Sequence, residues 1–135
     1  MSWDIFVHDI PAGAQTVADI PDDFRPRPLG KRTDVIRRIL DVVPADFANP
    51  SWGTFRGDDF SIEFNMGNDE DLSSFALHVR GGDAAAGLVA DLLTRCGWRA
   101  LDPSSDSGIF DPEGAVDGLK RWRAYLDLLR SVRFE

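Results

Sequence analysis

Cysteine is nearly absent from this chain of 135 residues, whose single thiol is Cys96. One cysteine forms no disulfide within the chain and supplies no zinc site built from several thiolates, which favours a reducing compartment. Long apolar runs are missing too, since no stretch approaches the roughly 18 residues that a membrane helix needs. The first residues also lack the basic and then apolar pattern of a secretory signal. We therefore expect a cytoplasmic protein that does not span a membrane.

Basic residues are scarce: 15 Lys and Arg stand against 23 Asp and Glu, for a formal net charge of −8. Binding to phosphates is driven mainly by Lys and Arg, so this balance argues against nucleic acid and anionic membranes as partners. The chain also lacks the Gly-x-Ser-x-Gly and His-Glu-x-x-His signatures, and no motif calls for a cofactor. We therefore expect no cofactor. Another protein is the class of partner that these observations leave, and the sequence does not determine the oligomeric state.

Hydrophobic periodicity predicts one α+β domain over residues 1–135, with a mostly antiparallel sheet of about five strands and about three helices packed on one face. Alternating apolar and polar residues predict strands at 3–8, 52–56, 60–66, 75–80 and 98–101. Apolar stripes with cap residues predict helices at 33–43, 84–96 and 112–130. The expected order is β-α-β-β-β-α-β-α.

Residues 9–31 form an irregular, proline-rich segment without periodicity. Its basic residues contrast with the acidic remainder of the chain, which suggests a recognition arm for a partner. The candidate binding residues are Arg25, Arg27, Lys31 and Arg32. The alternative is a cover that packs over the sheet edge through its apolar residues. These residues are Ile10, Val17, Ile20, Phe24 and Leu29.

Both histidines of the chain fall on the polar side of predicted strands. If the strand at 3–8 pairs beside the strand at 75–80, four polar residues share the open face of the sheet. These candidate catalytic residues are His8, Glu63, His78 and Arg80. General acid and base catalysis needs such groups within hydrogen-bond reach, whereas histidines on a sheet face are more often structural.

The loop at 102–113 resembles a twelve-residue calcium-binding loop in part. Its oxygen-bearing residues at ligand positions are Asp102, Ser104, Asp106 and Glu113. The glycine required at the sixth position is replaced by Ser107, and the predicted strand at 98–101 stands where the entering helix belongs. Asp111 and Pro112 also explain the last acidic residues as the start of a helix. We therefore expect a capping loop and no metal site.

Several segments resemble a group of small uncharacterised bacterial proteins that begin Met-Ser-Trp-Asp-Ile and have no assigned activity. The matching segments are residues 1–7, 19–23, 49–53 and 78–83. The resemblance implies a bacterial, single-domain, cytoplasmic protein and transfers no catalytic residues.

Two functions from different classes remain. The first is a non-catalytic interaction module, for example an acidic protein that neutralises a basic protein partner, with residues 9–31 as the expected contact. The second is a small enzyme or ligand binder that uses the open sheet face.

Overall fold

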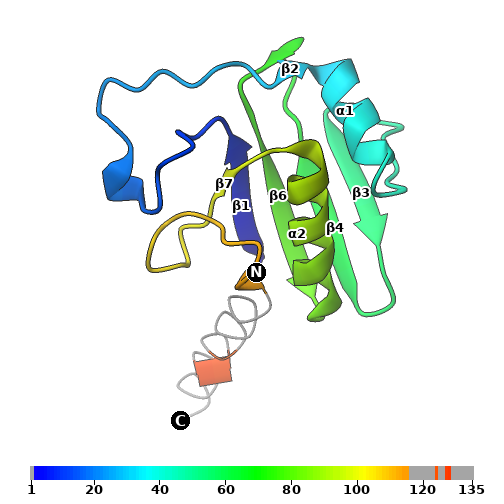
Figure 1. Cartoon of the computed structure of the whole chain (residues 1–135). Helices are drawn as coiled ribbons and strands as arrows, with labels where there is room; N and C mark the ends of the chain where they lie inside the picture. The colour runs from blue at the N-terminus through cyan, green and yellow to red at the C-terminus, as the bar shows by residue number, and fades with distance from the viewer. Residues whose placement is uncertain (1, 116–123, 125–126, 129–135) are drawn as a thin grey trace.

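A computed structural model describes residues 2–115, 124 and 127–128. In this part, five antiparallel strands form one sheet in the order β3-β4-β6-β1-β7 (Figure 1). The strands are β1 (Trp3–His8), β3 (Trp52–Arg56), β4 (Phe60–Asn65), β6 (Ser74–Gly81) and β7 (Ala100–Leu101). The predicted α+β class with a mostly antiparallel sheet is confirmed.

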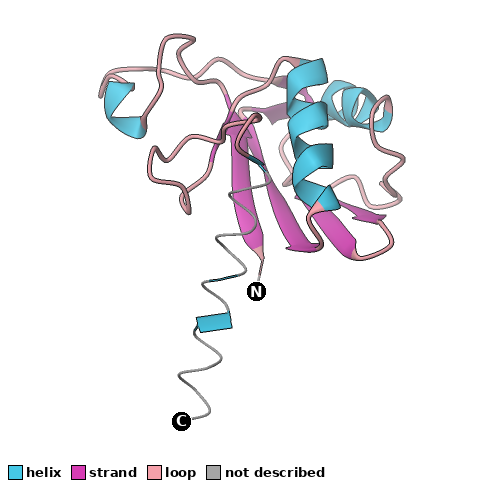
Figure 2. Cartoon of the chain, turned by 60° about the horizontal axis from the view of Figure 1, so that its bottom comes forward, coloured by secondary structure: helices cyan, strands magenta, loops and turns pink. Residues whose placement is uncertain are grey.

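The two described helices, α1 (Arg32–Leu40) and α2 (Ala84–Cys96), lie on the same side of this sheet (Figure 2). The predicted bounds of α2 are correct, and Gly97 ends the helix with a left-handed φ of 68°. Helix α1 ends at Leu40, three residues before the predicted position, because the chain leaves the α-helical pattern in a tighter turn in which the Val42 N–H bonds to the Ile39 carbonyl oxygen. Most of the helix predicted at 112–130 lies outside the described residues.

The expected element order missed three short elements. Residues 9–31 are not wholly irregular, because they contain a 3-10 helix, η1 (Val17–Asp19), and strand β2 (Gly30–Lys31). Strand β2 pairs with β5 (Asp71–Leu72) in a separate two-stranded sheet. A strand of two residues is too short to produce the alternation that predicts longer strands. The strand expected at 98–101 is likewise reduced to its last two residues.

The main core lies between the sheet and the helices. Alternate residues of the three central strands point into it and are almost fully buried, among them Ile5, Phe64 and Leu77. Helix α1 contributes Ile39 and helix α2 contributes Leu92. Since successive side chains of a strand alternate between faces, the intervening polar residues lie on the opposite side of the sheet.

We call that opposite side the open face. It is defined by the outward residues Asp4, Phe6, Trp52, Glu63, His78 and Arg80. Neither described helix covers it (Figure 2). Phe6 and Trp52 are each 38% exposed there.

Candidate functional site

Strand pairing brings three polar residues from different parts of the chain into one row across the open face. His78 of β6 lies opposite Asp4 of β1 on one side and opposite Glu63 of β4 on the other. Side chains directly opposite each other in an antiparallel pair lie about 4.5–5.5 Å apart at Cβ. The register therefore places an imidazole between two carboxylates.

Asp4 and His78 form a direct pair, with Asp4 Oδ1 2.7 Å from His78 Nδ1. The Ser2 hydroxyl donates a hydrogen bond to the same carboxylate oxygen. Burial raises the pKa of Asp4, but the hydrogen bonds from Ser2 and His78, together with nearby positive charge, outweigh it and hold that pKa below its usual value. Asp4 is therefore an ionised anchor for the imidazole at neutral pH.

Glu63 connects two further side chains, Trp52 and Arg80, to this row. Its Oε2 accepts a hydrogen bond of 3.0 Å from Trp52 Nε1, and its Oε1 pairs with the Arg80 guanidinium. The Trp52 ring stacks on the His78 imidazole, with centroids 5.6 Å apart and planes 23° from parallel. Trp52 is thus held in one orientation by a hydrogen bond and by a ring contact.

The structure brings together three of the four candidate catalytic residues. Glu63, His78 and Arg80 share one network, whereas His8 lies four residues from Asp4 along β1, about 13 Å at the usual strand rise. His8 pairs with Ser74 in the register, and its Nδ1 lies 2.8 Å from the carbonyl oxygen of the next residue. His8 therefore does not join the network.

Sequence reasoning missed Asp4 and Trp52 as members of this site. Both lie on the polar side of predicted strands, so the alternation itself contained the signal. Their membership depends on which strands are neighbours, and periodicity does not determine that.

Within the first half of the 9–31 segment, residues 10–14 pack on the rest of the chain, whereas Val17, which was expected to belong to a cover, is 48% exposed. Ile10 and Ala14 are buried against Ile109 in a small second core. The Arg99 guanidinium donates hydrogen bonds to the carbonyl oxygens of Pro11 and Ala14, at 2.5 and 2.6 Å. These contacts fasten residues 10–14 to the chain around β7.

The second half of the segment is exposed over residues 21–28, apart from the half-buried Phe24. Arg25 and Arg27 lie on this stretch, and Asp9 Oδ2 accepts a hydrogen bond from the backbone N–H of Arg27 at 2.9 Å. Arg32 instead donates to Ser51 Oγ and to a nearby carbonyl oxygen, at 3.1 and 2.8 Å. Lys31 is exposed in β2. Arg32 thus serves the fold, while the other three basic residues face solvent.

The loop at 102–113 uses its acidic residues in turns. Asp102 is 3% exposed, and its Oδ1 accepts hydrogen bonds from the backbone N–H and hydroxyl of Ser104, at 3.0 and 2.6 Å. Asp111 Oδ1 accepts one from the Glu113 backbone N–H at 3.0 Å. Among the described residues, no group of three or more His, Cys, Asp or Glu is placed to hold a metal ion.

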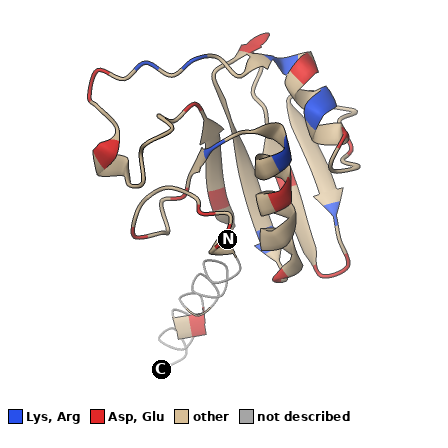
Figure 3. Ribbon diagram, in the orientation of Figure 1, with Lys and Arg blue, Asp and Glu red and all other residues tan. Residues whose placement is uncertain are grey.

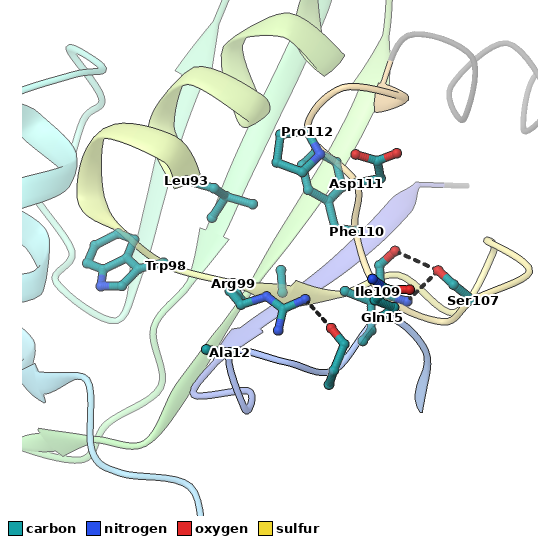
Figure 4. A pocket seen from close by; sticks show the side chains of 12 residues that line it. Ala12, Gln15, Leu93, Trp98, Arg99, Ser107, Ile109, Phe110, Asp111 and Pro112 are labelled. Carbon is teal, nitrogen blue, oxygen red and sulfur yellow. Dashed lines mark hydrogen bonds between the residues drawn. The ribbon is translucent and has the colours of Figure 1, made fainter. Parts of the chain in front are cut away.

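Two hollows flank Arg99. The first has a volume of about 470 Å³ and is lined by Leu93, Trp98, Phe110 and Asp111 among others (Figure 4). Arg99 extends along it toward the Ala14 carbonyl group that it binds. The second hollow, of about 410 Å³, also includes Arg99 and Trp98. Neither hollow includes a residue of the open-face network.

No described helix is both long and apolar enough to cross a membrane. No protein-family model matches the chain, and comparisons with curated proteins and with solved structures found no match either.

Proposed function

We propose that this protein is a non-catalytic binding module of the cytoplasm that docks another protein on its open face. The observation that carries the proposal is Trp52, a large side chain that is 38% exposed yet held by Glu63 and His78. Tryptophan is enriched among the residues that dominate binding energy at protein interfaces. A side chain that is already ordered also loses less conformational entropy when a partner binds.

Both edges of the sheet favour docking on the face over addition of a strand. At the β3 edge, the Thr54 carbonyl oxygen and N–H already bond to the backbone of Asp46, at 2.8 and 3.0 Å. At the β7 edge, Leu101 forms a bridge with Ile109. Pairing of an edge with its own chain blocks the row of free N–H and C=O groups that strand addition needs.

The net charge of −8 supports a cationic partner, as in neutralisation of a basic protein. Opposite charges increase the encounter rate, and salt screens this effect. The association rate with the partner is therefore expected to fall as ionic strength rises, with a smaller change in the dissociation rate.

The test is capture of partners from the source cell with the tagged full-length protein and two variants. Trp52→Ala should lose a stoichiometric partner that the unchanged protein retains. Leu40→Ala is the matched control, because Leu40 is a similarly exposed apolar residue on α1, 43% exposed and away from the open face. Retention of every partner by Trp52→Ala would show that the open face is not the docking surface.

A second candidate is acid–base catalysis, which the 2.7 Å contact between Asp4 and His78 favours. A carboxylate that binds Nδ1 orients the imidazole and leaves Nε2 available for proton transfer. A screen of ester and phosphoester substrates with the His78→Gln variant would test it, with His8→Gln as control. Turnover that His78→Gln removes and His8→Gln retains would replace the binding proposal with an enzymatic one.

A further inference from the structure

The hollow of about 410 Å³ gathers positive charge from three separate parts of this acidic chain. We call it the arginine pocket. Its polar lining consists of His8, Asp9, Arg27, Arg38 and Arg99. Basic positions occur on the exposed chain before β2, on α1 and between α2 and β7 (Figure 3). The pocket contains no residue of the network formed by Asp4, Trp52, Glu63, His78 and Arg80, so a ligand site within it does not depend on the proposed docking function.

The guanidinium groups of the arginine pocket have no carboxylate partner among the described residues. Elsewhere in the described chain, Arg37, Arg80 and Arg95 each form an ion pair with a nearby acid. In a chain with 23 Asp and Glu, three arginines that line one hollow and form no ion pair within the described part of the chain are a specific arrangement. Such a group of charges favours an anion from outside the chain.

Two of these arginines are held in place by neutral groups. Arg38 donates to the Cys96 carbonyl oxygen at the end of α2, and its guanidinium lies 4.9 Å from the centroid of the Trp98 ring. Arg99 is fixed by its bonds to two carbonyl oxygens of residues 11–14. Each guanidinium has five N–H donors, of which these contacts occupy one on Arg38 and two on Arg99.

Arg27 differs from the other two because only its backbone is tied down. Its N–H donates to Asp9 Oδ2, while its side chain is exposed and has no hydrogen bond to another described residue. The side chain is therefore free to close over a ligand in the pocket. Asp9 is the single acid of the lining, which leaves a net charge of +2 with His8 neutral.

We propose that the arginine pocket binds a small anion that carries a carboxylate or phosphate group. Guanidinium groups match the geometry of both, and charge-assisted hydrogen bonds to them are about twice as strong as neutral ones. The volume is within the range of small-molecule sites, about 300–1,000 Å³. The C-terminal end of α2 carries partial negative charge, which disfavours an anion, but the Arg38 guanidinium binds the Cys96 carbonyl oxygen there and offsets that charge.

The experiment is calorimetric titration of the full-length protein with sodium phosphate and, separately, with sodium succinate, at ionic strength held constant with sodium chloride. We expect a Kd of about 1 mM or tighter for at least one of the two probes. Binding of phosphate alone assigns a phosphate ligand, binding of succinate alone assigns a carboxylate ligand, and binding of both supports the shared chemistry.

Matched variants locate the binding. Arg27→Gln should weaken Kd about tenfold, because one charge-assisted hydrogen bond is lost. Arg25→Gln removes the same charge two residues away, outside the lining, and should change Kd less than about twofold. Since Arg27 has an exposed side chain, its variant keeps the fold. Equal weakening by both variants, or a Kd above about 10 mM for both probes, would overturn the proposal.

Discussion

The assignment of residues to the two faces of the sheet can be tested with two phenylalanines. Phe64 is fully buried on the core side, where its ring lies 5.5 Å from that of Phe47. Phe6 is on the open face and is 38% exposed. Replacing a fully buried Phe with Ala costs about 3–5 kcal/mol, because the transfer free energy and a cavity term add.

The same replacement at Phe6 should cost much less. Complete burial of a Phe side chain is worth about 1.5–3 kcal/mol, so the covered part of Phe6 is worth about 1–2 kcal/mol. No closed cavity forms at Phe6 because solvent reaches the site. We therefore expect the Phe64→Ala loss to exceed the Phe6→Ala loss by about 1–4 kcal/mol.

The assay is urea unfolding followed by tryptophan fluorescence, with the midpoint and the slope fitted for each variant. A changed midpoint at constant slope reports a change in the free energy of unfolding. Because small domains are stable by only about 5–15 kcal/mol, Phe64→Leu serves as a milder variant if Phe64→Ala does not fold. Equal losses at Phe6 and Phe64 would refute the assignment of faces, and with it the geometry of the open-face network.

Three further predictions concern the acid range, a backbone turn and calcium. His78→Asn should raise the pKa of Asp4 in an NMR titration, because the variant lacks the hydrogen bond and positive charge of His78. Folding lowers that pKa, so Asp4 contributes stability that is lost as pH falls from its unfolded pKa through its folded pKa; in the variant this loss should be smaller and complete at a higher pH, and an unchanged acid profile would contradict the network. Gly81→Ala should lower the free energy of unfolding by about 1–3 kcal/mol, because φ is 99° there and the added Cβ would lie 2.3 Å from the Asp59 carbonyl oxygen. Gly87→Ala in α2 is the control: its Cβ meets nothing within 4 Å, so it should raise the free energy of unfolding by about 0.5–1 kcal/mol. Calcium should not raise the melting temperature, and a rise that Asp102→Ala abolishes would establish a site in the loop at 102–113.

Local patterns in the sequence determined the helices and the longer strands. The alternation in β4 and β6 predicted which side chains enter the core, because strand geometry sends successive residues to opposite faces. Asp83 before α2 and Gly97 after it predicted the two ends of that helix. The same alternation predicted that Glu63, His78 and Arg80 lie on the face of the sheet opposite the core.

Only the tertiary structure decided which of these elements are neighbours. Asp4 and His78 are 74 residues apart and meet because β1 pairs with β6, a contact that depends on the packing of the whole sheet. The arginine pocket likewise joins Arg27, Arg38 and Arg99 from a loop, a helix and a strand junction. Periodicity assigns a residue to a face, whereas its neighbours across strands and loops are set by non-local contacts that leave no period in the sequence.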